Sequence, residues 1–204
     1  MLLNGSSAAN RVLILAHGAG APMDTPFMNF FAKSLAGPDL RVARFEFPYM
    51  KNRRVTGKRS GPNGKAILFS TWRDAIKAFH GKRIAIGGKS MGGRIASMIA
   101  DESPASALVC LGYPFHPIGK PTQLRTDHLV NLTTPTLIVQ GTRDRFGNQN
   151  EVENYGLAGS IKTHWIPDGD HSLKPRKSSG RTEQQNWNEA VISIREFLFE
   201  NLAN

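Results

Sequence analysis

The sequence predicts an α/β fold, a mostly parallel twisted sheet flanked by helices. Short β-rich apolar runs alternate with segments of helical period along the chain, the pattern of a parallel sheet with crossover helices. One apolar run, residues 84–86, leads through a glycine-rich turn directly into an amphipathic segment. The 204 residues, 40% of them hydrophobic, contain no linker, repeat or low-complexity tract. We therefore expect one domain over residues 1–204.

Six segments are expected to form strands. Each is a short apolar run, and segments of helical period or turn residues lie between them. In chain order they are residues 12–16, 42–47, 84–86, 107–111, 136–140 and 161–166.

Four helices are expected between and after these strands. The first is Pro26–Leu35, with Thr25 as its cap and a proline in its first turn. Residues 65–79 and 94–101 follow, and the last helix opens with the capping-box pattern Thr182-x-x-Gln185. Their apolar stripes are core positions: Leu68, Trp72, Ala75 and Phe79, then Ile95, Met98 and Ile99, then Trp187, Val191, Ile194 and Leu198.

The composition limits the kind of protein this is. The formal net charge is +10, and much of it lies in residues 51–65 and 174–181. A nucleic-acid partner is unfavoured, because no zinc spacing, recognition motif or interleaved aromatic residues accompany this charge. No apolar run approaches the ~20 residues of a membrane span, and no secretory signal is evident. A single cysteine, Cys110, excludes an intrachain disulfide and fits a reducing compartment, so the prediction is a cytoplasmic protein. Cys110 itself is expected in the core.

A Gly-x-Ser-x-Gly turn, formed by Gly88, Ser90 and Gly92, follows the third strand and precedes a helix. In that setting it resembles the nucleophile elbow of the α/β-hydrolases, where a strained turn lifts one hydroxyl above the sheet edge. Glycine is needed on both sides because neighbouring backbone comes into contact there. Ser90 is therefore the candidate nucleophile.

A serine nucleophile needs a base to take its proton and an acid to orient that base. In this fold the chain order is serine, acid, histidine. Among six histidines, His171 fits best, in a turn-rich loop between the last strand and the last helix. Asp144, in the loop after the fifth strand, is the candidate acid. Asp168 and Asp170 are closer to His171, but aspartate in turns commonly bonds its own backbone.

Two backbone N–H groups are expected to stabilise a developing oxyanion. One is that of Met91, which follows the nucleophile. The second is assigned to Ala19, with Gly20 the next choice, in the small-residue loop after the first strand. His17 in that loop is expected to bond backbone and to take no part in proton transfer.

The two basic segments follow the carboxyl ends of strands, where the site of a parallel α/β sheet lies. An anionic group on the substrate could then be held by Arg53, Arg54 or Arg59, since guanidinium groups bind carboxylate and phosphate in a bidentate manner. The alternative, solvated loops that keep the protein soluble, stays open. No metal and no cofactor is expected.

Further short motifs indicate a particular family: residues 15–21, 47–50, 53–54, 57–59, 88–94 and 169–172. The chain resembles the α/β-hydrolase superfamily over nearly its whole length, and more narrowly a small family of predicted hydrolases. That family includes the testis-expressed protein 30 type and the third subunit of the human nonspecific-lethal acetyltransferase complex, and is related to dienelactone hydrolases, which carry cysteine at the elbow.

The resemblance implies the fold and the triad but no substrate. Many α/β-hydrolases insert a lid near residues 113–135, and here that connection leaves no room for a large one. We therefore expect an open site and a serine hydrolase that cleaves an ester or related acyl bond of a small molecule through an acyl-enzyme. A non-catalytic scaffold module and an acyltransferase with the same triad are the alternatives. The intact triad favours an enzyme over the scaffold.

Overall fold

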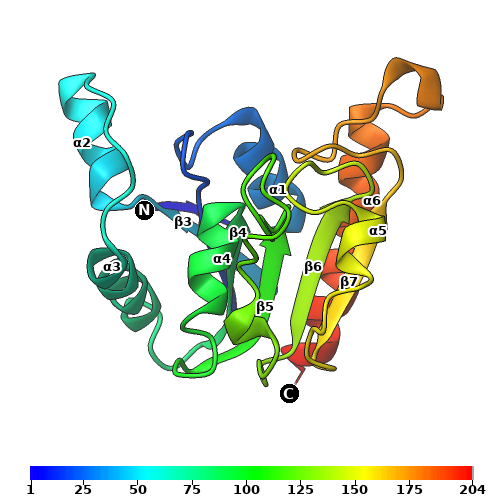
Figure 1. Cartoon of the computed structure of the whole chain (residues 1–204). Coiled ribbons are helices and arrows are strands. Elements are labelled where there is room, and N and C mark those ends of the chain that lie inside the picture. The colour runs from blue at the N-terminus through cyan, green and yellow to red at the C-terminus, as the bar shows by residue number, and fades with distance from the viewer. Residues whose placement is uncertain (204) are drawn as a thin grey trace.

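The computed structural model describes residues 1–203, and its seven strands form one sheet (Figure 1). The strand order is β1-β3-β2-β4-β5-β6-β7, and every neighbouring pair is parallel except the antiparallel pair β1 and β3. The chain moves outward in one direction from β2 and in the other from β4. Their carboxyl ends therefore form the switch point at which sites of this architecture lie. The strands are β1 Leu2–Asn4, β2 Arg11–Ala16, β3 Leu40–Phe45, β4 Arg83–Lys89, β5 Ala105–Leu111, β6 Thr136–Gly141 and β7 Ile161–Ile166.

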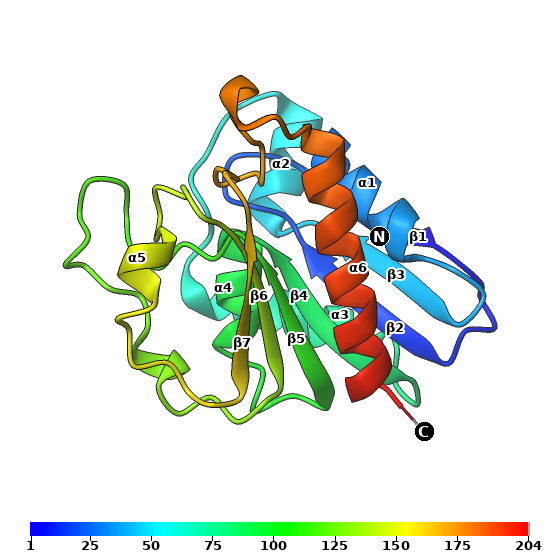
Figure 2. The same ribbon diagram turned by 90° about the vertical axis from the view of Figure 1, so that its right-hand side faces the viewer.

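Helices cover both faces of the sheet. In Figure 2, α1 and α6 lie together over one face, and α3 and α4 lie behind the sheet on the other. Tyr49 of α2 and Val152 of α5 pack into the same core as α3 and α4. The helices are α1 Pro26–Leu35, α2 Pro48–Thr56, α3 Lys65–Lys77, α4 Met91–Ser97, α5 Gln149–Val152 and α6 Glu183–Asn201, with 3-10 turns at Asp127–Leu129 and Lys177–Ser179.

Two hydrophobic cores result, one on each face, because side chains alternate along each strand. In β2, Val12 and Ile14 pack with α3 and α4, whereas Leu13 and Leu15 pack with α1 and α6. Central strands buried on both faces explain why the apolar runs are nearly continuous. Cys110 of β5 lies in the first core and is 1% exposed.

All six expected strands are present, and four other expectations need correction. The strand β1 was not expected, because three residues are too short to show a pattern. Nor was α2, whose only buried residues are Tyr49 and Met50. The third expected helix, residues 94–101, is α4, which begins at Met91 and ends at Ser97. Trp187 of α6 is partly exposed, and Asn186 lies buried beside it.

The carboxyl edge of the sheet carries no large lid. The connection from β5 to β6 contains a single 3-10 turn, Asp127–Leu129, within residues 112–135. The two basic segments, around α2 and around residues 174–181, rise on either side of this edge in Figure 1. No helix within residues 1–203 is long and apolar enough to cross a bilayer.

Candidate active site

The turn between β4 and α4 holds Ser90 in a strained conformation. Its φ of 52° and ψ of −118° are unusual for a residue with a side chain. A Cβ at Gly92 would lie 2.4 Å from the carbonyl oxygen of Ala16, and one at Gly88 would lie 2.3 Å from the same atom. Both flanking positions therefore require glycine so that β2 and the turn can approach closely.

Three segments bring Ser90, His171 and Asp144 into one hydrogen-bonded line. Ser90 Oγ lies 2.9 Å from His171 Nε2, and His171 Nδ1 lies 2.7 Å from Asp144 Oδ2. The Nδ1–H donates to the carboxylate, which leaves Nε2 as the acceptor for the serine hydroxyl. The ring of Phe146 packs on the imidazole, with 4.4 Å between the ring centroids.

The carboxylate of Asp144 is buried and faces three donors. Oδ2 accepts from His171 and from Gln140 Nε2 at 3.0 Å, and Oδ1 accepts from the N–H of Phe146 at 2.9 Å. The amide of Gln140 is itself oriented, because its Oε1 accepts from the N–H of Tyr113 at 2.7 Å. Both carboxylate oxygens of Asp144 therefore accept hydrogen bonds that fix the orientation of the side chain. Gln140 is a functional neighbour that the sequence analysis missed.

The imidazole of His171 is poised as an acceptor. Burial lowers its pKa below the ordinary value of 6.5, the hydrogen bond with Asp144 opposes this shift, and the charge of Lys89 adds to it. The ring is consequently neutral at neutral pH, as a base must be.

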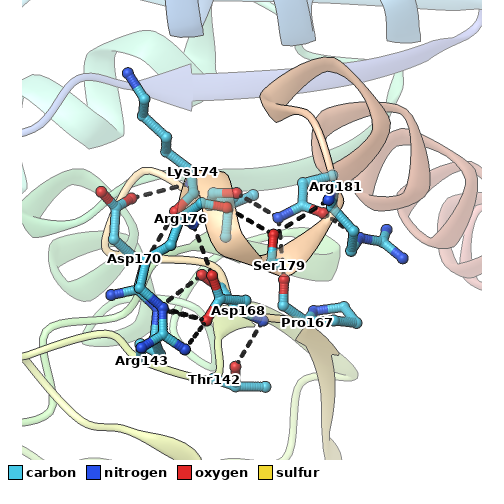
Figure 3. Close-up of polar contacts among 11 residues, drawn as sticks. Thr142, Arg143, Pro167, Asp168, Asp170, Lys174, Arg176, Ser179 and Arg181 are labelled. Carbon is cyan, nitrogen blue, oxygen red and sulfur yellow. Dashed lines mark hydrogen bonds and ion pairs between the residues drawn. The ribbon is translucent and has the colours of Figure 1, made fainter.

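A charge cluster joins the loop of Asp144 to the loop of His171 (Figure 3). Asp168 has a φ of 52° and lies between Arg143 and Arg176. Its Oδ1 lies 2.9 Å from Arg143 Nε, and its Oδ2 accepts from the N–H of Arg176 at 2.6 Å. Asp170 accepts instead from the N–H groups of Ser172 and Lys174. Both aspartates thus hold the loops in place. Asp168 links Arg143, which precedes Asp144, to Arg176 in the segment after His171.

The loop after β2 lies against the elbow. A Cβ at Gly18 would lie 3.7 Å from Ser90 Cβ, so the two segments are in contact. Tyr49 Oη donates to the carbonyl of Ala19 at 2.9 Å. Met91 is the first residue of α4, and its N–H therefore has no intrahelical acceptor. The two N–H groups predicted for the oxyanion thus belong to segments that adjoin Ser90.

His17 is buried and bonds to backbone at both ring nitrogens, as expected. Nδ1 lies 2.7 Å from the carbonyl of Gly18, and Nε2 accepts from the N–H of Phe47 at 3.2 Å. With both nitrogens occupied, His17 holds the loop after β2 against the segment that follows β3.

A cavity of about 410 Å³ opens at Ser90. Its wall contains Lys89, which the sequence analysis used only as a family motif. No group of three or more histidine, cysteine, aspartate or glutamate residues suited to a metal ion occurs within residues 1–203. The lining residues are Gly18, Ala19, Gly20, Ala21, Pro22, Thr25, Phe27, Met28, Lys89, Ser90, Phe146, His171 and Ser172.

The three arginines predicted to hold an anion do not line this cavity. Arg54 lies on α2 and is neutralised by Glu46 and Asp24, with Nη2 2.6 Å from a carboxylate oxygen of each. These hydrogen bonds raise the pKa of Arg54 further above its ordinary value. Arg53 Nη1 donates to the carbonyl of Gly20 at 3.0 Å, and Arg59 is exposed. Arg53 and Arg54 therefore fix loops, and the structure gives neither a free charge directed at Ser90.

A family model described as an alpha/beta hydrolase domain matches residues 9–199. The chain belongs to this family. Solved structures agree in fold. An α/β serine hydrolase without lid from Xanthomonas campestris is 14% identical, with a TM-score of 0.71 over 99% of this chain and 88% of that one. Dienelactone hydrolase from Anabaena variabilis is 20% identical, with a TM-score of 0.72 over 98% and 90%. The esterase domain of a Rhodothermus marinus protein is 13% identical, with a TM-score of 0.69 over 98% and 92%.

Proposed function

We propose that this α/β-hydrolase is a serine carboxylic-ester hydrolase. The observation that carries the proposal is the hydrogen-bonded line from Ser90 through His171 to a buried Asp144. Ser90 Oγ attacks the acyl carbon while its proton passes to His171 Nε2. The resulting imidazolium is stabilised by Asp144 and then gives the proton to the leaving alcohol.

The tetrahedral oxyanion is held by the N–H groups of Met91 and Ala19. Such donors, fixed before the reaction begins, contribute about 10²- to 10³-fold each in related sites. Water then attacks the acyl-enzyme with His171 again as the base, and Ser90 is released. Ser90 and His171 are partly exposed in an uncovered cavity, so water can reach the acyl carbon.

The cavity suits a small acyl group. Likeness to esterases and to dienelactone hydrolase supports ester hydrolysis in general and selects no natural substrate. The motif match with the testis-expressed protein 30 type supports membership of that narrower family. A single, buried cysteine is in keeping with a cytoplasmic location.

The proposal is tested with p-nitrophenyl esters of short acids. Wild type should release nitrophenolate with a rapid first turnover, because the acyl-enzyme forms before water attacks. Ser90→Ala should lose the first turnover and nearly all steady-state activity. Ser106→Ala removes an exposed serine near the amino end of β5, away from the cavity, and serves as the matched control. A folded wild type that hydrolyses none of these esters would favour the scaffold alternative.

A further inference from the structure

Lys89 occupies an unusual place in the cavity wall. It is the last residue of β4 and directly precedes Ser90. Its Nζ donates to the carbonyl oxygen of His171 and lies 5.3 Å from the ring centroid of Phe27. A Cβ at position 112 would lie 2.7 Å from this Nζ, so Gly112 leaves the space that the ammonium group occupies.

The ammonium group has no counterion within the described part of the chain. No salt bridge of residues 1–203 includes Lys89. Burial lowers its pKa to about 8, opposed by Asp144 and Asp170, and both of these carboxylates are bonded to other groups. Lys89 is only partly exposed, and a positive charge with restricted access to water gains from an anionic partner. The cavity thus presents a partly exposed positive charge that forms no salt bridge within residues 1–203.

The donor count leaves room for a ligand. An ammonium group carries three donors. One is used by the carbonyl of His171, and the face of Phe27 provides a second favourable contact. Phe27, His171 and Lys89 all line the same cavity, so an anion placed there can reach the remaining donor.

We propose that Lys89 binds a carboxylate carried by the ester substrate, so that the preferred substrates are anionic esters. This inference rests on the proposed hydrolase activity and adds the substrate class. In this proposal Lys89, beside the nucleophile, binds the anion, and the arginines of α2 do not. Phe27 and Met28, both in the wall, would contact the apolar part of the same substrate.

A purely structural role for Lys89 makes a different prediction. If the ammonium group serves only to hold the carbonyl of His171, its loss displaces the base and slows every ester by the same factor. If it binds the substrate's carboxylate, its loss slows anionic esters much more than neutral ones. The ratio of kcat/KM for matched anionic and neutral esters therefore separates the two roles.

The test compares p-nitrophenyl hemiglutarate with p-nitrophenyl valerate, and acetylated 4-hydroxybenzoate with phenyl acetate. The first pair carries the charge on the acyl side and the second on the alcohol side. In at least one pair, Lys89→Met should lower the anionic-to-neutral ratio by about 10- to 100-fold, the value of a charge-assisted hydrogen bond. Lys89→Arg should keep most of the preference. Lys174→Met, which removes an exposed lysine from the loop after His171, should leave the ratio unchanged.

Equal losses on anionic and neutral esters, in both pairs, would overturn the proposal. A second measurement does not depend on turnover: calorimetric titration of glutarate and of 4-hydroxybenzoate into Ser90→Ala, with and without Lys89→Met. At least one acid should bind, and the added substitution should weaken that binding by about tenfold or more. Absence of binding by both acids would also overturn the proposal. If no ester is hydrolysed but an acid binds through Lys89, the proposed activity fails and the anion site stands.

Discussion

Replacement of Asp144 by asparagine should nearly abolish activity, because it exchanges a hydrogen-bond acceptor for a donor without changing the size of the side chain. The side chain keeps its size, but one acceptor oxygen becomes an NH₂ donor. In the structure both carboxylate oxygens face donors: His171 Nδ1–H and Gln140 Nε2 at Oδ2, and the N–H of Phe146 at Oδ1. Gln140 cannot turn its oxygen toward Asp144 without losing the N–H of Tyr113. In either orientation, the NH₂ group of the asparagine therefore faces another hydrogen-bond donor.

The two orientations have different costs. With NH₂ toward His171, the imidazole must change tautomer, and Nε2 can no longer accept the proton of Ser90. With NH₂ toward Phe146, a buried N–H loses its partner, which costs about 1–3 kcal/mol of folding stability. In both, the imidazolium that forms during the reaction loses its negative neighbour. The expected loss in kcat is about 10³- to 10⁴-fold, the scale of this substitution in other serine triads.

The assay is kcat/KM for p-nitrophenyl acetate together with urea unfolding of the same samples. Asp101→Asn is the matched control, because Asp101 also accepts from several donors, the N–H groups of Thr133 and Thr134. It lies beyond α4, at the end of the sheet where β6 begins, so the substitution should lower stability without lowering activity. A folded Asp144→Asn that retains a tenth of wild-type kcat/KM would show that activity does not depend on the carboxylate of Asp144.

Four further outcomes are expected. In a pH profile, kcat/KM for a neutral ester should fall only below pH 6.5, because the lowered pKa of His171 keeps the base neutral down to that region; an acid limb centred above this value would contradict the assignment. The preference for anionic esters should fade as pH rises through about 8, because Lys89, which faces Asp144, Asp170 and His171, loses its proton there. A preference that persists unchanged well above this pH would contradict binding of the carboxylate by Lys89. Asp168→Ala should lower kcat by about 10- to 100-fold by loosening the two loops, with little change in circular dichroism, whereas wild-type kcat would show that the cluster with Arg143 and Arg176 does not position the site. Gly92→Ala should cost about 1–3 kcal/mol or more in urea unfolding because its Cβ would overlap the carbonyl of Ala16, whereas Gly61→Ala, with open space around it, should stay near wild type.

The sequence sufficed for the fold because the central strands and helices carry their own patterns. Strands buried on both faces are continuous apolar runs, and the elbow needs glycines at fixed spacing around Ser90. The order of Ser90, Asp144 and His171 follows from connectivity, since the loops after β4, β6 and β7 meet at one edge of a parallel sheet. The structure places His171 within hydrogen-bonding distance of both Ser90 and Asp144.

What could not be predicted depends on contacts between distant segments. The helix α2 is short, basic and mostly exposed, so no apolar stripe distinguishes it from a loop. The pairing of Arg54 with Glu46 and Asp24 depends on how α2 lies relative to the residues that follow β3 and precede α1, and the sequence alone does not show this. Without these ion pairs the arginines resemble a free anion site. Gln140 did leave a signal, a polar residue at the end of an apolar strand.

Lys89 is the second missed neighbour of the candidate site. Its position between Gly88 and Ser90 was visible in the sequence, but its place beneath the loop of His171 depends on Gly112, at the end of another strand. Only the packing of β4 against β5 shows that a lysine fits there.

The most direct test of the central claim is covalent labelling with a fluorophosphonate, followed by peptide mass mapping. We expect one adduct, on the peptide that contains Ser90, which is absent in Ser90→Ala and forms much more slowly in His171→Ala. A folded wild type that stays unlabelled, or that carries the adduct on another serine, would contradict it.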